Sequence, residues 1–435
     1  MITSVTYRTA FVPGKKDYVA LLTNIIQKGI WSDYVLYEAK DDIRIALGSL
    51  ARLELTSESL YLYYENQVQV EATHDPFKHA EHLLGRLPMQ DWTAYGYVAF
   101  DTAGYYLPYA KRIEEPLMAF VIPETELRLT NDGIFIRTAG DLDAIQMLVN
   151  EEMSIPAFEA SHVSIEGNRD WYEERVALLR HKIQERHLHK AILSRSMTVP
   201  GKLDILGTYI VGARMNSRAR SYCFALGPVR GVGFSPETLL EAERDGWVLT
   251  NPLAGTRPRG GTPEDDTLLF NELFEDAKEM KEHAISIWHA QAEIASVCMP
   301  ESVRIFDFMN VKKYRCVQHL SSQVGGKLQT NKSTWDAFKV LFPGITVSGV
   351  DKTAALAWIN HLEEEPRGIY AGAVGWIDAC GAADFAIAIR SVYQYQERIR
   401  LNAGAGIMAE SDPQKEYIES VNKMNTMLHT LVLAG

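Results

Sequence analysis

Three strand-like runs follow one another closely in IYAGAVGWIDACGAADFAIAIRSVYQYQERIRLNA, residues 369–403. The runs are Ile369–Ala379, Asp384–Gln394 and Arg398–Ala403. Connections of only a few residues favour strands that pair as antiparallel neighbours. This stretch therefore predicts a mostly antiparallel sheet near the C-terminus.

Helical patterns lie on both sides of these strands in the sequence. Trp171–Glu185 has the apolar spacing of a helix, and Thr262–Pro263 resembles an N-cap followed by proline at the first helical position. We expect a long helical stretch from there to about Val297, and a final helix that starts at Asp412–Pro413. Because strand clusters and helices do not alternate as in βαβ units, we expect an α+β fold with large, mostly antiparallel sheets flanked by helices.

The N-terminal and C-terminal parts of the chain differ in their sequence patterns. Residues 1–165 carry short alternating runs, such as Ser59–Tyr64 and Tyr95–Phe100, and no cluster of residues suited to chemistry. The clearer helix and strand patterns and the candidate catalytic residues fall in residues 166–435. We therefore expect an N-terminal α+β part that packs into the same fold as a C-terminal catalytic region.

Composition argues against several classes of protein. The chain has 435 residues, of which 46% are hydrophobic and 23% charged, as is usual for a globular protein. Its net charge of −12, without a basic run, argues against nucleic acid as a partner. We expect no membrane span and a cytoplasmic location, because no signal peptide and no apolar stretch of about 18 residues is found. Reduced thiols are expected for the four cysteines, which form no C-x-x-C pair: Cys223, Cys298, Cys316 and Cys380.

Two pairs of glutamates have helical spacing. Glu279 and Glu282 lie three apart in the long helical stretch, and Glu416 and Glu419 lie three apart in the last helix. Residues at this spacing share a helix face, so two opposed faces would suit Mg²⁺, which prefers oxygen ligands. On spacing alone, two solvated helix faces are the more common explanation, because glutamate is frequent on helices.

A di-iron carboxylate bundle is a rival for these glutamates. It requires Glu-x-x-His on two helices, a spacing found at Glu71/His74 and Glu159/His162. Both stand in turn-like surroundings, which speaks against this alternative.

Two strand segments could contribute to a pocket. LNAGAGIM, residues 401–408, places Gly404 and Gly406 between a strand and the final helix, where backbone N–H groups could approach an anion. DFAIAIR, residues 384–390, has one bulky face and one small face that ends in Arg390. Arg390 could bind a carboxylate there or lie at the edge of an ordinary packed sheet.

Three single residues could take part in acid–base chemistry. Lys190 begins an apolar run, where it is either a snorkelling edge residue or a buried base. Glu237 follows an apolar turn, where it is either a protonated acid or an ordinary charge near a helix start. His319 could be a hydrogen-bond donor in a pocket, although an isolated histidine is more often structural.

Several of these segments occur in one order that resembles the chorismate-binding enzymes: anthranilate, aminodeoxychorismate, isochorismate and salicylate synthases. The motifs are GFSPE (233–237), PLAGTR (252–257), KEMKEH (278–283), VQHLSS (317–322), FPGITVSG (342–349), AGAGI (403–407) and E-x-x-E-x-x-x-K (416–423). The resemblance is dense over residues 170–435 and loose before them. It implies the anthranilate synthase component I-like fold.

Particular positions indicate a branch of this family. Lys190 is typical of the water-using isochorismate and salicylate synthases, whereas the ammonia users typically have glutamine there. Ala254 speaks against the aminodeoxychorismate type, which often has lysine, and the tryptophan-feedback motifs of the anthranilate type are not found. His319 and Thr346 resemble the salicylate synthases. Asp351, where proline is frequent, and Asn251 depart from the family pattern at positions matched to no catalytic residue.

The resemblance implies a role for each matched residue. Lys190 would be the base, Glu237 the acid, and His319 and Thr346 would position the substrate. The metal ligands would be Glu279, Glu282, Glu416 and Glu419, holding Mg²⁺ directly or through water. Substrate binding would fall to Gly255, Thr256, Tyr370, Arg390, Gly404, Gly406 and Lys423.

The implied activity is a Mg²⁺-dependent salicylate synthase that converts chorismate through isochorismate to salicylate and pyruvate. The alternatives are an isochorismate synthase without the lyase step, or an anthranilate synthase component I that needs ammonia from a glutaminase partner. We expect a monomer that requires no glutaminase. Salicylate made by this family commonly serves siderophore assembly.

Overall fold

The computed structural model describes residues 5–40, 42–111, 113–151, 154–164, 169–216, 219–313 and 317–435. In this part of the chain, every helix is too short or too polar to cross a membrane. The thiols of Cys223, Cys298 and Cys380 are free, and Cys316 lies outside the described residues.

Sheet A has eleven strands, drawn from the whole length of the sequence. Its order is β1 (Arg8–Pro13), β10 (Gly133–Thr138), β9 (Thr125–Leu129), β3 (Asp42–Leu47), β2 (Tyr34–Ala39), β12 (Arg220–Leu226), β13 (Val229–Ser235), β22 (Ser391–Tyr395), β23 (Arg398–Ile407), β11 (Lys190–Pro200) and β19 (Gly349–Val350). Neighbouring strands run antiparallel, as expected.

Sheet B has twelve strands, again with antiparallel neighbours. Its order is β16 (Leu253–Pro258), β18 (Val317–Lys327), β15 (Trp247–Asn251), β14 (Thr238–Ala242), β21 (Ala383–Ile387), β20 (Ala373–Asp378), β7 (Thr93–Val98), β8 (Met118–Ile122), β4 (Ala51–Leu55), β5 (Ser59–Tyr64) and β6 (Gln67–Ala72). The remaining strand, β17 (Arg304–Lys313), pairs with β18.

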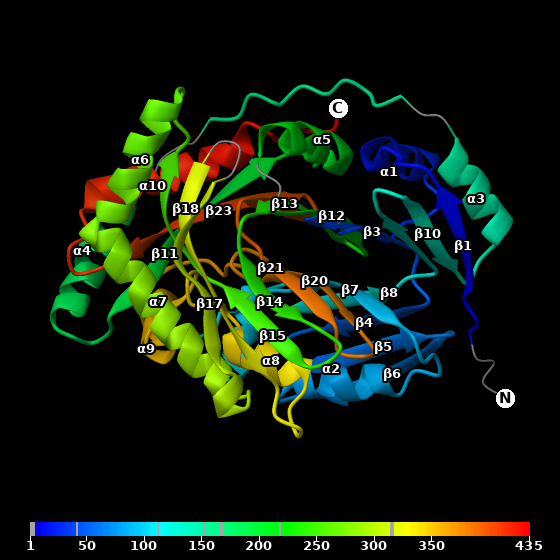
Figure 1. The fold of residues 1–435 in the computed structure, drawn as a ribbon, viewed down its shortest axis with the longest axis horizontal. Coiled ribbons are helices and arrows are strands. Elements are labelled where there is room, and N and C mark those ends of the chain that lie inside the picture. The colour runs from blue at the N-terminus through cyan, green and yellow to red at the C-terminus, as the bar shows by residue number, and fades with distance from the viewer. Residues whose placement is uncertain are drawn as a thin grey trace.

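The two sheets face each other, and helices cover their outer sides (Figure 1). Over sheet A lie α1 (Tyr18–Lys28), α3 (Leu142–Asn150), α5 (Ile205–Met215) and α10 (Pro413–Leu428). Against sheet B lie α2 (Pro76–Gly85) and α8 (Thr334–Leu341). One end of the sandwich carries α4 (Arg169–Gln184), α6 (Pro263–Glu275), α7 (Ala277–Ala295) and α9 (Lys352–Leu362). Short 3₁₀ turns occur at Phe100–Tyr105 and Pro300–Ser302. The α+β fold with large antiparallel sheets is therefore confirmed.

Two chain crossings between the sheets determine where the candidate site forms. The chain leaves β13 of sheet A for β14 of sheet B through Glu237, and it returns from β21 to β22 through Arg390. The crossings lie side by side, because the Ile387 amide donates to the Glu237 carbonyl and the Phe234 amide to the Arg390 carbonyl, each at 3.0 Å. Arg390 has a φ of 49°, a left-handed conformation that is uncommon for a residue with a side chain.

The second crossing corrects one expectation. Asp384–Gln394 was expected as a single strand, but it is divided between β21 and β22 in different sheets. Hydrophobic alternation continues across the break, so the sequence pattern alone cannot show that the chain changes sheet. Arg390 consequently lies beyond the strand that was expected to carry it.

The long helical stretch is also divided, into α6 and α7. Asp276 ends the first helix and caps the second, since its carboxylate accepts from the amides of Lys278 at 3.0 Å and Glu279 at 3.2 Å. Aspartate is a strong N-cap because it satisfies free amides at a helix start. The glycines of AGAGI lie within β23, whereas a turn after a strand was expected.

Strands from both sides of residue 165 pair in both sheets. β2 pairs with β12 in sheet A, and β7 pairs with β20 in sheet B. The proposed division at this residue stays a prediction.

Candidate active site

A cavity of about 730 Å³ opens where the two crossings meet α7, β23 and α10. Twelve of the fifteen candidate residues line it: Glu237, Gly255, Glu279, Glu282, His319, Thr346, Tyr370, Arg390, Gly404, Gly406, Glu419 and Lys423. Lys190 and Glu416 form ion pairs with residues of the wall. Thr256 lies in β16, and its side chain is outside the described part of the chain.

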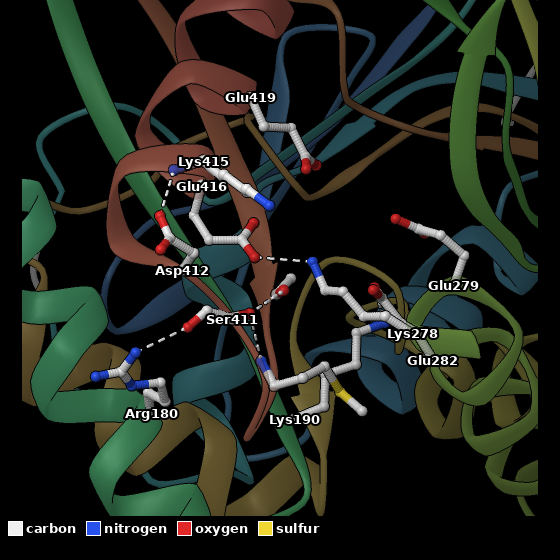
Figure 2. Close-up of polar contacts among 12 residues, drawn as sticks. Arg180, Lys190, Lys278, Glu279, Glu282, Ser411, Asp412, Lys415, Glu416 and Glu419 are labelled. Carbon is white, nitrogen blue, oxygen red and sulfur yellow. Dashed lines mark hydrogen bonds and ion pairs between the residues drawn. The ribbon is translucent and has the colours of Figure 1, made fainter. Parts of the chain in front are cut away.

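Two acidic helix faces oppose each other across this cavity (Figure 2). Glu279 and Glu282 project from the first turns of α7, and Glu416 and Glu419 project from α10. The spacing of three residues places both members of each pair on one face. Solvated outer faces are therefore not the explanation for these glutamates.

Lysine ammoniums hold three of the four carboxylates. The pairs are Lys190–Glu282 at 2.8 Å, Lys278–Glu416 at 2.8 Å and Lys423–Glu419 at 2.7 Å. Burial, followed by repulsion from the Glu282 carboxylate, raises the pKa of Glu279 to about 7. Burial also raises the pKa of Glu416. For Glu419 the effect of burial is outweighed by nearby cations, chiefly Lys423 together with Lys278 and Arg257, so its pKa is lowered.

These glutamates fit Mg²⁺ by ligand type. Carboxylate oxygens are its preferred protein ligands, and Oε2 of Glu416 is buried and accepts no hydrogen bond. Among the described residues, no three acidic, histidine or cysteine side chains already converge as a ready-made metal site. A lysine ammonium instead pairs with one oxygen on each of Glu282, Glu416 and Glu419.

The di-iron alternative is wrong. Glu71 lies in β6, and the segment that contains Glu159 and His162 has no helical structure. Helix-borne Glu-x-x-His motifs are therefore missing at these positions.

Lys190 is buried at the start of β11, with 1% of its side chain exposed. Its ammonium donates to Oε1 of Glu282 at 2.8 Å and to the Ser286 hydroxyl at 3.3 Å. The alternative of a snorkelling edge residue is excluded by this burial. A buried amine beside the cavity is placed to exchange a proton with a bound reactant.

Glu237 is a buried carboxyl at the first crossing, with 4% exposure. Its Oε1 accepts from the Thr346 hydroxyl at 2.6 Å and from the Leu253 amide at 3.0 Å. Burial raises its pKa to about 7, against the opposing effect of the Thr346 hydrogen bond. At neutral pH the carboxyl is therefore present in both forms, and it can donate a proton.

Arg390 and His319 form a linked pair at the cavity wall. Nδ1 of His319 donates to the Gly255 carbonyl at 2.9 Å, which leaves Nε2 to accept from the Arg390 guanidinium at 3.3 Å. Burial and the nearby Arg390 charge lower the pKa of His319 to about 3, so the ring is neutral. The expectation of a histidine that donates into the pocket is corrected, since the donor nitrogen faces the protein.

The glycines of β23 give the cavity a smooth wall next to the acidic faces. A Cβ atom at Gly406 would lie 2.5 Å from Oε1 of Glu282. Lys423 donates to the Gly404 carbonyl at 3.0 Å while it holds Glu419. Tyr370 is a buried residue of the cavity wall, and this burial raises its pKa.

Sequence reasoning missed several further residues of the wall, three of which lie close to candidate positions in the sequence. Lys278, Asn402 and Lys415 all line the cavity. Lys278 had a signal, because it begins the KEMKEH motif and directly precedes Glu279. Asn402 and Lys415 lie two and one residues from matched positions, and only the orientation of β23 and α10 reveals them.

Comparisons with known proteins identify a family. A family described as chorismate binding enzyme matches residues 32–429. A salicylate synthase of Mycolicibacterium paratuberculosis is 33% identical over 422 residues, covering 96% of this chain and 93% of that protein. An anthranilate synthase component 1 of Haloarcula marismortui is 40% identical over 271 residues, covering 61% of this chain and 50% of that protein.

Solved structures share the fold. The anthranilate synthase component I of Streptococcus pneumoniae has a TM-score of 0.77 at 28% identity, covering 89% of this chain and 92% of that chain. A menaquinone-specific isochorismate synthase of Escherichia coli has a TM-score of 0.74 at 19% identity, covering 98% and 95%. The expected anthranilate synthase component I-like fold is thereby confirmed.

Proposed function

The chain belongs to the family of chorismate binding enzymes, and from that premise we propose that it is a Mg²⁺-dependent salicylate synthase. The observation that carries the proposal is a buried, partly protonated glutamate in the cavity wall together with a buried lysine that pairs with Glu282 of the same wall. The similarity to a salicylate synthase over 96% of the chain supports the same choice.

The first step would exchange one hydroxyl of chorismate for another. Lys190 pairs with Glu282 as an ammonium in this structure, and it must first release a proton to solvent. Its neutral Nζ then takes a proton from a water molecule that attacks ring C2. Glu237 donates its proton to the C4 hydroxyl, which departs as water. The product is isochorismate.

Other residues of the cavity wall would bind and orient the two carboxylates of the substrate. Arg390 offers a guanidinium to the enolpyruvyl carboxylate, in a position that His319 fixes by accepting its hydrogen bond. Mg²⁺, held by Glu279, Glu282, Glu416 and Glu419, would neutralise and orient the ring carboxylate.

The second step would release pyruvate. The C2 hydrogen passes to the enolpyruvyl methylene, the C3–O bond breaks, and the ring becomes aromatic. Because this transfer lies within the substrate, the protein need only hold the reactive conformer and exclude water. Thr346 and the buried Tyr370, both in the cavity wall, are suited to that task.

An anthranilate synthase component I is the second candidate, because such a protein is 40% identical over a shorter span. That activity would need ammonia and, in the cell, a glutaminase partner. We propose that this chain needs neither, since Lys190 stands where ammonia users typically have glutamine.

Purified protein incubated with chorismate and Mg²⁺, without ammonia, tests the proposal. We expect salicylate and equimolar pyruvate by chromatography with fluorescence detection, and no turnover with a chelator present. Isochorismate without pyruvate would assign the chain to isochorismate synthases, and turnover only with ammonia would assign it to anthranilate synthases.

Lys190→Gln gives the matched test of the base. It should lower water-dependent turnover by at least about 100-fold, the usual contribution of a general base. Lys202→Gln removes an exposed lysine just beyond the same strand and should leave turnover unchanged. Full turnover by Lys190→Gln would show that the base is elsewhere.

A further inference from the structure

Lys278 is the lysine that joins the two acidic helix faces. Its ammonium extends from α7 toward α10, into the space that the four glutamates surround (Figure 2). It lies 2.8 Å from Oε1 of Glu416, whose side chain is only 3% exposed, whereas 26% of the Lys278 side chain is exposed. A partly accessible cation thus neutralises a buried carboxylate.

The other two lysines that pair with these glutamates are held by additional partners. Lys190 also donates to the Ser286 hydroxyl, and Lys423 also donates to the Gly404 carbonyl. Lys278 lies at the cavity surface, and its charge interacts with Glu282 and Glu419 besides Glu416. Of the three lysines, it is the one whose ion pair joins α7 to α10.

We propose that Lys278 is a built-in counter-cation that holds Glu416 while the site is empty of metal and competes with a divalent cation for that carboxylate. The inference rests on the proposed function, because it takes the four glutamates to be metal ligands. Like charges repel, so the Lys278 ammonium weakens metal binding by its presence as well as by its contact with Glu416. In return, it stabilises the metal-free protein, where a buried carboxylate without a partner would be strongly unfavourable.

Direct metal binding to the chelator-treated, full-length protein tests this without turnover. Mn²⁺ is the probe, since it shares the preference of Mg²⁺ for oxygen ligands and its free form is measured by electron paramagnetic resonance. Lys278→Met should bind Mn²⁺ about tenfold more tightly than the wild type, because one nearby positive charge is removed. Lys278→Gln, which keeps a hydrogen-bond donor without the charge, should also bind more tightly.

Two variants serve as controls. Lys281→Met removes a lysine of the same helix that pairs with the exposed Glu410 at 2.7 Å, and it should bind Mn²⁺ as the wild type does. Lys278→Arg keeps the charge and should stay within about twofold of the wild-type affinity.

Thermal unfolding gives an independent readout. In chelator, Lys278→Met should unfold at a lower temperature than the wild type. Saturating Mn²⁺ should raise the Tm of this variant by more than it raises that of the wild type, since tighter binding stabilises the folded state more. Lys281→Met should show neither change.

The outcomes separate the inference from the function on which it rests. If Lys278→Met and Lys278→Gln bind Mn²⁺ no more tightly than the wild type, the counter-cation role is overturned while the metal site stands. If the wild type itself binds no Mn²⁺, the metal in the proposed function is wrong, and competition at Lys278 fails with it.

Discussion

Glu237 acquires its altered acidity from its position at the crossing between the sheets. A carboxyl removed from water favours its neutral form, and burial is the largest influence on the pKa of Glu237. The Thr346 hydroxyl and the charges of Lys190 and Lys423 act in the opposite direction, which leaves the pKa near neutrality. A group with this balance can serve as an acid at physiological pH.

Replacing Glu237 tests this assignment. Glu237→Gln should lower kcat by at least about 100-fold, because the amide cannot protonate the departing hydroxyl. Glu243→Gln, an exposed change close in sequence, should leave kcat unaltered. Isochorismate formed by Glu237→Gln at the wild-type rate would place the acid elsewhere.

The pH dependence of kcat/KM tests the same assignment of Glu237 as the acid. The pKa of Glu237 is raised to about 7, so the proton it must donate is present below this value and is lost as the pH rises through it. We expect kcat/KM, which reports the free enzyme, to decline as the pH increases through about 7. A profile that stays flat through this range would contradict the role of Glu237.

At the scale of elements, β23 shows how closely spaced glycines take on different tasks. A Cβ at Gly404 would lie 2.7 Å from the Leu193 carbonyl, part of the adjacent strand backbone. A Cβ at Gly406 would instead meet the Glu282 carboxylate, the far end of a flexible side chain. One glycine therefore permits strand packing, and the other leaves room for a candidate metal ligand.

Alanine at each glycine should separate stability from activity. Gly404→Ala should lower the free energy of unfolding by about 1–3 kcal/mol, because backbone cannot move aside easily. Gly406→Ala should change it by less than about 1 kcal/mol but reduce turnover by at least about tenfold, since Glu282 is displaced. Urea unfolding and product formation measure the two effects, and equal stability losses in both variants would argue against this division.

At the scale of the whole molecule, a buried ion pair joins the segments that carry the site. Arg367 and Glu363 lie 2.7 Å apart, with 1% and 4% of their side chains exposed. The Arg367 guanidinium donates to the carbonyls of Ile192 in β11 at 2.6 Å and Val347 at 2.7 Å. This pair therefore connects the strand that begins at Lys190 to the segment that holds Thr346.

Breaking this pair should destabilise the entire fold. Arg367→Met should lower the free energy of unfolding by about 3–5 kcal/mol, because Glu363 would be left buried without its partner. Arg169→Met breaks the exposed pair with Glu173 and should change it by less than about 1 kcal/mol. Urea denaturation measures both, and similar losses in the two variants would contradict the proposed importance of burial.

The sequence by itself determined the class of fold, the family and the composition of the site. Alternating strand runs and capped helices are local signals, so they predicted antiparallel sheets and the helices that carry the two glutamate pairs. The ordered motifs identified the candidate residues, twelve of which line the cavity. The roles of these residues stay predictions until the experiments above are done.

Only the tertiary structure decided how those residues face one another. The change of sheet at Arg390, the acceptor role of the His319 Nε2 atom and the pairing of lysines with Glu282 and Glu416 depend on segments far apart in the chain. Hydrophobic periodicity records which face of an element is buried, but it does not record which partner covers that face. Burial and charge therefore emerge only when the sheets close over the cavity, and with them the acidity of Glu237 and the position of Lys278.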